Sequence, residues 1–366
     1  MVSTTEMHRS SRSPDELARR LEAWLALRLP GARIASLNAT AANGMSSETV
    51  LVDVDHDGGA ERLAVRLAPD VGDCPVFPVY DLAAQFETIR LVAELTDVPV
   101  PNGRWLEPDA GAVGTPFFVM DRVDGDVPPD VMPYSFGDSW VFAASLDEQE
   151  RLQRSTLEVL ASLHGIDAAA DRFAFLERSE PGDTQLRRHV SHTRAWYEFA
   201  TVDLGARSPL VEQLFARLER TWPVTESPGV LSWGDARIGN VMYRDFAPVA
   251  VLDWEMAGIG PCELDVAWLV YAHRIFDDLA HAYGFPGMPQ LFRVDDVARA
   301  YESLTGHAVR DLEWFLTYAA LNYGIVFLRT GCRAVRFGER DLPADIDDLI
   351  INREPLERML EGTYWS

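Results

Sequence analysis

The stretch that decides the fold is LSWGDARIGNVMYRDFAPVAVLDWEMAGIGP, residues 231–261. It carries Asp235, Asn240 and Asp253 around two short apolar runs. The alternation in VMYRDFAPVAVLDW predicts a hairpin in which 241–243 pair with 249–252 across 244–248. Asp235 and Asn240 then lie on one tight loop, and Asp253 ends the next strand. The three polar side chains can therefore meet at one edge.

These three residue types suit phosphoryl transfer, which depends on in-line positioning and on charge neutralisation by magnesium. A carboxylate must accept the hydrogen bond of the attacking hydroxyl, and oxygen ligands must hold the metal. Magnesium prefers carboxylate and amide oxygens and keeps several waters. Two aspartates and one asparagine supply both functions.

The rest of the chain divides into a small lobe that mixes sheet and helix and a larger, mainly helical lobe. Residues 14–29 form an amphipathic helix, 44–69 a hairpin hinged at 57–59, 79–95 a second helix and 115–123 a buried strand. Helices dominate 147–164, 185–222, 263–284, 295–305 and 311–333. The fold class is α+β, with a mobile arm at 1–13, a nucleotide-binding lobe at 14–120, a hinge at 121–125 and a helical catalytic and acceptor-binding lobe at 126–366.

The opening stretch resembles the catalytic and metal loops of the aminoglycoside phosphotransferase family, relatives of the protein kinases. The family pattern is roughly His-Gly-Asp, four residues, Asn, an apolar strand and Ile-Asp-Trp-Glu. Here it reads Trp233-Gly234-Asp235, then Asn240, then Leu252-Asp253-Trp254-Glu255. The resemblance implies a protein-kinase-like bilobal fold. It implies that Asp235 is the catalytic aspartate, that Asn240 and Asp253 are magnesium ligands, and that Asp265 braces the catalytic loop.

Two positions near the catalytic aspartate need separate treatment. Trp233 occupies the place of the family's usual histidine, so we expect retained activity with altered loop packing. Arg237 stands where protein kinases carry a lysine that faces the transferred phosphate, and a surface arginine is the equal alternative.

The small lobe extends the resemblance to ATP binding. NGMSSETVLV resembles the nucleotide-covering turn, and Arg66 stands where relatives hold the nucleotide phosphates with a lysine or arginine. A glutamate in the second helix is the partner expected for Arg66, with a solvent-facing side chain as the alternative. The residues assigned to the nucleotide are Gly44, Ser46, Ser47, Arg66, Glu87 and, through the backbone, Asp121 and Val123.

Composition limits the classes of partner. Lys and Arg total 33 against 57 Asp and Glu, a net charge of -24, which argues against non-specific nucleic-acid binding and against anionic membranes. Only three cysteines occur, no apolar run of 18 residues is present, and the N-terminus has no secretory signal pattern. We therefore expect a soluble, cytoplasmic protein. His189 and His192 are interpreted as surface helix residues rather than ligands.

The predicted function is ATP- and magnesium-dependent O-phosphorylation of a small molecule. In the family the acceptor is an aminoglycoside, a choline-like alcohol, homoserine or a hydroxyacyl group. An acidic helical lobe favours a cationic acceptor, but such a charge is also ordinary surface chemistry, so the acceptor stays open. Residues assigned to a cationic acceptor are Glu255, Asp277 and Asp278, and those that wall its pocket or pack the lobe are Tyr134, Phe136 and Trp140.

Two other functions compete with this one. A nucleotide-binding pseudoenzyme with a regulatory role would bind magnesium and ATP without turnover. A protein kinase would need a peptide platform, but Pro261 and a helix follow Asp253 almost at once. The oligomeric state stays open.

Overall fold

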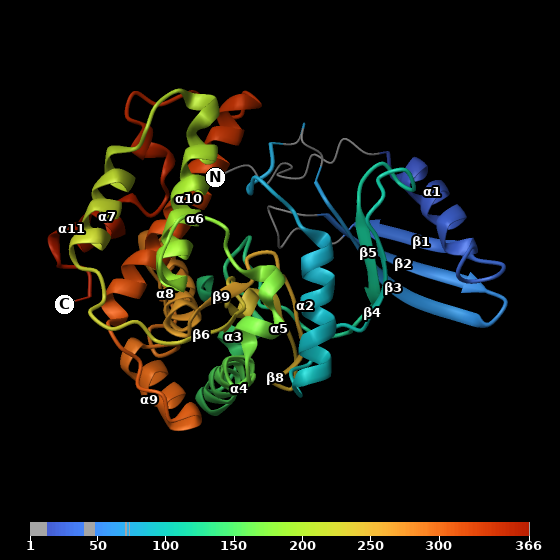
Figure 1. Cartoon of the computed structure of the whole chain (residues 1–366), viewed down its shortest axis with the longest axis horizontal. Coiled ribbons are helices and arrows are strands. Elements are labelled where there is room, and N and C mark those ends of the chain that lie inside the picture. The colour runs from blue at the N-terminus through green and yellow to red at the C-terminus, as the bar shows by residue number, and fades with distance from the viewer. Residues whose placement is uncertain (1–12, 40–47, 70–71, 73, 366) are drawn as a thin grey trace.

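The computed structural model describes residues 13–39, 48–69, 72 and 74–365, and it has the expected bilobal α+β architecture (Figure 1). A five-stranded sheet with two helices forms the smaller lobe, and helices dominate the larger one. Gly44, Ser46 and Ser47 lie outside the described residues. No helix in the described part of the chain is both long and apolar enough to cross a bilayer.

The sheet of the small lobe is antiparallel throughout, in the order β1-β2-β3-β5-β4. Its strands are β1 (Arg33–Ala39), β2 (Glu48–His56), β3 (Gly59–Leu67), β4 (Gly103–Glu107) and β5 (Phe117–Asp121). The helices are α1 (Pro14–Ala26) and α2 (Leu82–Leu95).

The two faces of the sheet carry different cores because side chains alternate along a strand. Leu63 and Val65 of β3 pack in a cluster with Leu21 and Leu25 of α1. Ala64 between them belongs to a second cluster with Ile89 of α2 and the core of the large lobe. Arg66 follows two residues after Ala64 and so shares the face that looks toward the large lobe.

The large lobe is built mainly from helices, with two short strand pairs. The helices are α3 (Trp140–Ala143), α4 (Leu146–His164), α5 (Ala169–Arg172), α6 (Gln185–Thr201), α7 (Pro209–Arg220), α8 (Glu263–Ala282), α9 (Val294–Thr305), α10 (Leu312–Arg336) and α11 (Arg353–Glu361). The helical region predicted at 185–222 is two helices, because Pro209 starts a new helix that Ser208 caps. Short 3₁₀ turns cover Tyr134–Phe136, Ala174–Leu176, Val202–Leu204, Ile238–Asn240 and Ile346–Leu349.

The hairpin predicted in the opening stretch is present, with a tighter turn than expected. Strand β7 (Val241–Arg244) pairs with β8 (Ala247–Val251), and Val241 lies opposite Val251. Asp245 and Phe246 both have positive φ, which closes the turn in two residues. A second pair, β6 (Gly229–Ser232) with β9 (Gly258–Pro261), was not predicted, because GIGP shows no alternation of polar and apolar residues.

Backbone contacts connect this hairpin to the segment just after the hinge and to the small lobe. Asp126 and Tyr243 exchange two N–H to carbonyl bonds of 2.8 Å each. The amide of Val251 donates to the Pro99 carbonyl at 2.7 Å. The catalytic stretch is therefore tied to both lobes.

Candidate active site

The loop after β6 makes a sharp turn that only glycine allows. Gly234 has φ +90, and a Cβ on it would lie 2.3 Å from the Met256 carbonyl oxygen. A side chain there would meet both an unfavourable backbone conformation and a backbone clash. The turn places Asp235 directly after the point where the loop touches residue 256.

Asp265, near the start of α8, fixes this turn through hydrogen bonds. Its buried carboxylate accepts hydrogen bonds from Ser232 Oγ (2.8 Å) and from the amides of Trp233 (2.7 Å) and Gly234 (2.9 Å). His164 Nε2 lies 3.0 Å from the same carboxylate. A buried charge needs such partners, and here they are the backbone of the loop itself.

Trp233, at the position of the family's usual histidine, is fully buried. Its Nε1 donates to the Leu252 carbonyl at 2.9 Å, and its ring centroid lies 6.0 Å from that of Trp254. The indole thus ties the catalytic loop to the end of β8.

The Asp235 carboxylate is fixed by three side-chain donors. Trp268 Nε1 donates to Oδ1 at 2.7 Å, Asn240 Nδ2 donates to Oδ2 at 2.7 Å, and Arg237 Nε approaches at 3.0 Å. The amide nitrogen of Asn240 is thus already used as a donor to Asp235. The side-chain oxygen of Asn240 is therefore the atom that can ligate a metal.

Arg237 also bonds to Asp130, which the sequence did not single out. Burial works to lower the pKa of Arg237, but Asp235 and Asp130 outweigh it and hold the pKa well above its ordinary value. Burial raises the pKa of Asp130, although Arg237 opposes this. Asp130 Oδ1 is buried and has no hydrogen-bond partner among the described residues. Arg237, whose side chain is 14% exposed, is thus a mostly buried cation between two carboxylates rather than a surface arginine.

Asp253 lies beside this group, because the Leu252 amide donates to the Asn240 carbonyl at 2.9 Å. Asp253 has φ 62, the left-handed conformation that aspartate tolerates better than most residues. Arg66 Nη2 crosses from the small lobe to Asp253 Oδ1 at 2.6 Å and to Glu255 Oε2 at 3.1 Å. The structure therefore pairs Arg66 with both Asp253 and Glu255.

The predicted pairing of Arg66 with Glu87 is wrong. Arg66 points into the space between the lobes, where two carboxylates meet it. Glu87 lies on the outer side of α2 and accepts two hydrogen bonds from Arg90, at 2.8 and 2.9 Å. Glu87 is therefore the solvent-facing glutamate that the sequence offered as the alternative.

The two hinge positions assigned to adenine differ. The Asp121 amide donates to the Asn102 carbonyl at 2.9 Å, and its carboxylate accepts from Asn102 and Arg104. The amide of Asp121 is therefore already used. Val123 lies past the strand, and its backbone makes no hydrogen bond within the described ranges.

Most acceptor residues named from the sequence have structural contacts elsewhere. Asp277 accepts from the Met288 amide at 2.6 Å, and Asp278 contacts Arg274 and Tyr364. Tyr134 is buried against His273, and Trp140 packs on Tyr243 and Phe246. Phe136 stacks on Phe285. The assignment of Asp277 and Asp278 to a cationic acceptor is therefore corrected, and for Tyr134 and Trp140 the structure favours the alternative, packing of the large lobe.

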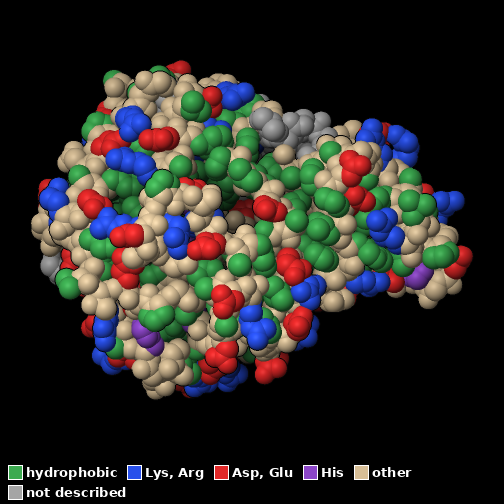
Figure 2. All heavy atoms as spheres, viewed as in Figure 1, with side chains coloured by type: hydrophobic (Ala, Val, Ile, Leu, Met, Phe, Trp, Pro, Cys, Tyr) green, Lys and Arg blue, Asp and Glu red, His purple; other side chains and the backbone are tan. Residues whose placement is uncertain are grey.

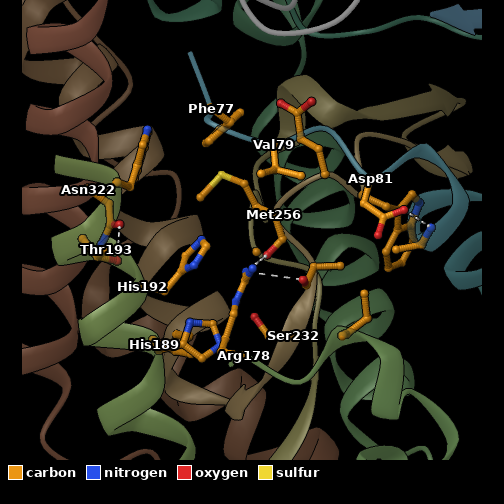
Figure 3. A pocket seen from close by; sticks show the side chains of 18 of the residues that line it. Phe77, Val79, Asp81, Arg178, His189, His192, Thr193, Ser232, Met256 and Asn322 are labelled. Carbon is orange, nitrogen blue, oxygen red and sulfur yellow. Dashed lines mark hydrogen bonds between the residues drawn. The ribbon is translucent and has the colours of Figure 1, made fainter. Parts of the chain in front are cut away.

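A cavity of about 420 Å³ opens beside the catalytic loop instead (Figure 3). Gly234 and Trp268 belong to its lining, so it reaches the Asp235 neighbourhood. On the face shown in Figure 2 the surface is hollowed between the lobes, with acidic side chains at the border. Further lining residues come from 77–85, from 175–180, from α6, from 254–257 and from α10; they include Phe77, Asp81, Arg178, His189, His192, Trp196, Met256 and Asn322.

Two histidines of α6 line this cavity, contrary to the sequence interpretation. His189 is only 8% exposed, and burial together with Arg178 and His192 holds its pKa well below the ordinary value. Burial and Arg178 also lower the pKa of His192, although its Nδ1 lies 2.6 Å from Glu180 Oε1. No motif pointed to Arg178, which lies in an irregular segment before α6.

Comparisons with known proteins identify a family and similar folds. A model described as the Phosphotransferase enzyme family matches residues 39–293. A protein from Ralstonia eutropha JMP134, provisionally described as an aminoglycoside phosphotransferase, is 20% identical; 94% of this chain and 97% of that chain are covered, with a TM-score of 0.64. Aminoglycoside phosphotransferase APH(4)-Ia, solved with ADP and hygromycin B, is 14% identical over 93% of this chain and 98% of that chain, with a TM-score of 0.53.

Curated relatives carry a different kind of name. Mouse acyl-CoA dehydrogenase family member 11 is 26% identical over 257 residues, which are 69% of this chain and 30% of that protein. The chain thus spans less than a third of the length of this relative. The two solved structures share the fold of this chain.

Proposed function

Because the chain belongs to the phosphotransferase enzyme family, we propose that it transfers the γ-phosphoryl group of ATP to a hydroxyl of a small molecule. The observation that carries the proposal is the arrangement of Asp235, Asn240 and Asp253, in which Asn240 bonds to Asp235 and to the backbone of the residue before Asp253. These residues supply one carboxylate for the acceptor hydroxyl and two oxygen ligands for a metal. The solved relatives that contain ADP or hygromycin B support a nucleotide and a small-molecule acceptor.

In this proposal Asp235 orients the acceptor hydroxyl and takes its proton. The hydroxyl oxygen forms a bond to the γ-phosphorus, and the bond from that phosphorus to the β,γ-bridging oxygen breaks. ADP leaves with the electron pair, and the products are ADP and a phosphate monoester. Trp268, Asn240 and Arg237 hold the carboxylate in one orientation, so little reorganisation is needed at the moment of transfer.

The donor set fits magnesium. Asn240 Oδ1 and the Asp253 carboxylate would hold the ion, which when bound neutralises charge on the phosphates. Arg66 now neutralises Asp253 and Glu255, and its buried Nε has no partner among the described residues. We propose that Arg66 contacts the nucleotide phosphates, that Val123 offers its backbone to adenine and that residues 121–125 act as the hinge.

Two variants separate the metal ligand from the base. Asp253→Ala removes a carboxylate ligand, so we expect magnesium-dependent ATP binding to weaken. Asp235→Asn keeps the shape of the side chain, so we expect ATP binding to persist while turnover falls. Isothermal titration with magnesium and ATP measures nucleotide binding by the two variants. Equal loss of binding in the two variants would contradict these roles.

A further inference from the structure

Arg178 lines the cavity, and the charge of nearby Glu180 acts on it without an ion pair in the described part of the chain. Its Nη2 donates to the carbonyl oxygens of Met256 and Ala257 at 3.2 and 3.4 Å, which are long hydrogen bonds. Its Nε is buried and has no hydrogen-bond partner in the part of the chain that the structure describes. No ion pair of Arg178 occurs within the same described residues. An arginine that lines a cavity and forms no ion pair is suited to bind the oxygen atoms of an anion.

The acids that line the same cavity are engaged with other groups. Glu177 pairs with Arg188 at 2.9 Å, and Glu180 lies 2.6 Å from His192. Glu255 pairs with Arg66 at 3.1 Å. Asp81 accepts from the Ala84 amide at 2.9 Å as the cap of α2. Arg178 is thus the lining cation left for a ligand anion, while each lining acid already has a donor.

Neighbouring side chains are suited to share an anion with Arg178. Figure 3 shows the guanidinium inside the cavity with His189 and His192 beside it. His189 is buried beside the backbone of Ile259, and both histidines line the cavity. An imidazole nitrogen can donate to an oxygen atom when it carries the proton. Arg178, His189 and His192 together form a polar site inside the cavity rather than a single charge on the surface.

The site lies close to the catalytic loop. Arg178 bonds to the Met256 carbonyl, and the same carbonyl lies against Gly234, the residue before Asp235. Trp268 lines the cavity and donates to Asp235. The cavity therefore extends from Arg178 to residues that adjoin or contact Asp235, and its volume of about 420 Å³ is that of a small-molecule site.

We propose that the acceptor carries an anionic group, a carboxylate or a phosphate, which Arg178 binds while the hydroxyl faces Asp235. This inference rests on the proposed phosphotransferase function and names its substrate class. Trp254, Met256 and Trp196 wall the cavity, so the body between the two groups is apolar. Guanidinium matches the paired oxygens of both anions.

The test compares hydroxylated ligands that carry a carboxylate, a phosphate or no charge. Short hydroxyalkanoates, the matching hydroxyalkyl phosphates and the neutral methyl esters are titrated into the full chain, and quenching of tryptophan fluorescence gives the dissociation constants. We expect one of the two anionic series to bind about ten- to a hundredfold more tightly than the esters. The free energy of a hydrogen bond to a charged group corresponds to a change of this size in the dissociation constant. The two anionic series distinguish carboxylate from phosphate.

Variants assign the difference to Arg178. Arg178→Gln should abolish the preference for the anion, and Arg178→Lys should retain part of it. Arg187→Gln should keep all of it, because Arg187 pairs with Glu219 on the outer side of α6. Melting temperatures of all variants show whether each is folded. Equal affinity for anions and esters, no binding by either series, or an unchanged preference in Arg178→Gln would overturn the inference.

The same ligands distinguish failure of the inference from failure of the proposed function. Phosphorylation of neutral or amino alcohols alone, with no effect of Arg178→Gln on acceptor affinity, would leave the phosphotransferase function and overturn the anion site. Binding of anions through Arg178 without any binding of magnesium and ATP would support the anion site and overturn the phosphotransferase function.

Discussion

Asp265 shows how much one buried carboxylate can organise. Two of its donors are successive backbone amides of the turn that precedes Asp235, and a third is the Ser232 hydroxyl. The side chain is fully buried, so water cannot replace any of these partners. The carboxylate therefore stabilises the fold and the shape of the catalytic turn together.

We predict that Asp265→Asn is destabilising and slows catalysis. An amide keeps one acceptor oxygen but turns an NH₂ group toward a backbone N–H, which leaves buried donors unpaired. The cost is about 1–3 kcal/mol. Urea unfolding measures it, with Asp296→Asn, an exposed partner of Arg299, as the control. A stability within a few tenths of a kcal/mol of the wild type would contradict the bracing role.

At the scale of elements, α6 lines the cavity with His189 and His192. His189 is buried close to β9: a Cβ on Gly260 would lie 3.0 Å from its Nε2. His192, one turn later, lines the same cavity beside Glu180. The helix therefore carries two imidazoles whose charged forms are disfavoured in the folded protein.

We predict that stability falls as the pH is lowered below about 6.5, the ordinary histidine pKa. The folded-state pKa of His189 lies well below that value, so the unfolded chain binds more protons in this range. Unfolding is then favoured with a slope of up to about 1.4 kcal/mol per pH unit for each such histidine. Denaturant unfolding between neutral and mildly acidic pH measures the slope.

The variant His189→Gln should reduce this slope, whatever its effect on stability at neutral pH. His281→Gln is the matched control, since His281 lies about half exposed on α8. If both variants keep the wild-type slope, His189 is not the group that takes up the proton on unfolding.

At the scale of the whole molecule, the two lobes meet at the candidate site. Arg66 of the small lobe bonds to Asp253 and Glu255 of the large lobe, and the Pro99 carbonyl accepts from Val251. A ligand that binds between the lobes would stabilise both of them. Such a ligand affects the melting temperature of the entire chain.

We predict that ATP with magnesium raises the melting temperature. Binding to the native state alone stabilises by about 2.7 kcal/mol at a hundredfold excess over the dissociation constant. The same nucleotide with a chelator should shift the transition less, because Asn240 and Asp253 then have no metal to hold. A melting curve unchanged by saturating nucleotide and magnesium would contradict the nucleotide assignment in the small lobe.

The sequence predicted the parts of the site that are close along the chain. The spacing of Asp235, Asn240 and Asp253 reflects one loop and one hairpin, so local geometry was enough to predict that they meet. Arg178 and Asp130 come from irregular segments, and their neighbours are far away in sequence, so no periodicity indicated them. Asp277 and Asp278 were misassigned because charge was considered without the direction of α8.

Long-range partners were the least predictable feature for the same reason. Arg66 was correctly given a strand position, but its partners Asp253 and Glu255 are 187 and 189 residues away. Glu87 was the nearer choice along the chain, and the orientation of α2 turns it to Arg90. Which side chains meet between lobes depends on lobe packing, which local patterns do not specify.

The most direct measurement is transfer of labelled phosphate from γ-labelled ATP to a panel of small hydroxylated acceptors. We predict that the wild type forms a labelled phosphate monoester. Asp235→Asn should form it about 10²- to 10⁴-fold more slowly while still binding magnesium and ATP, because only the group that takes the proton is lost. Asp245→Asn, in the exposed turn of the neighbouring hairpin, should retain the wild-type rate. A wild type that labels no acceptor, or an Asp235→Asn variant that labels one at the wild-type rate, would contradict the account.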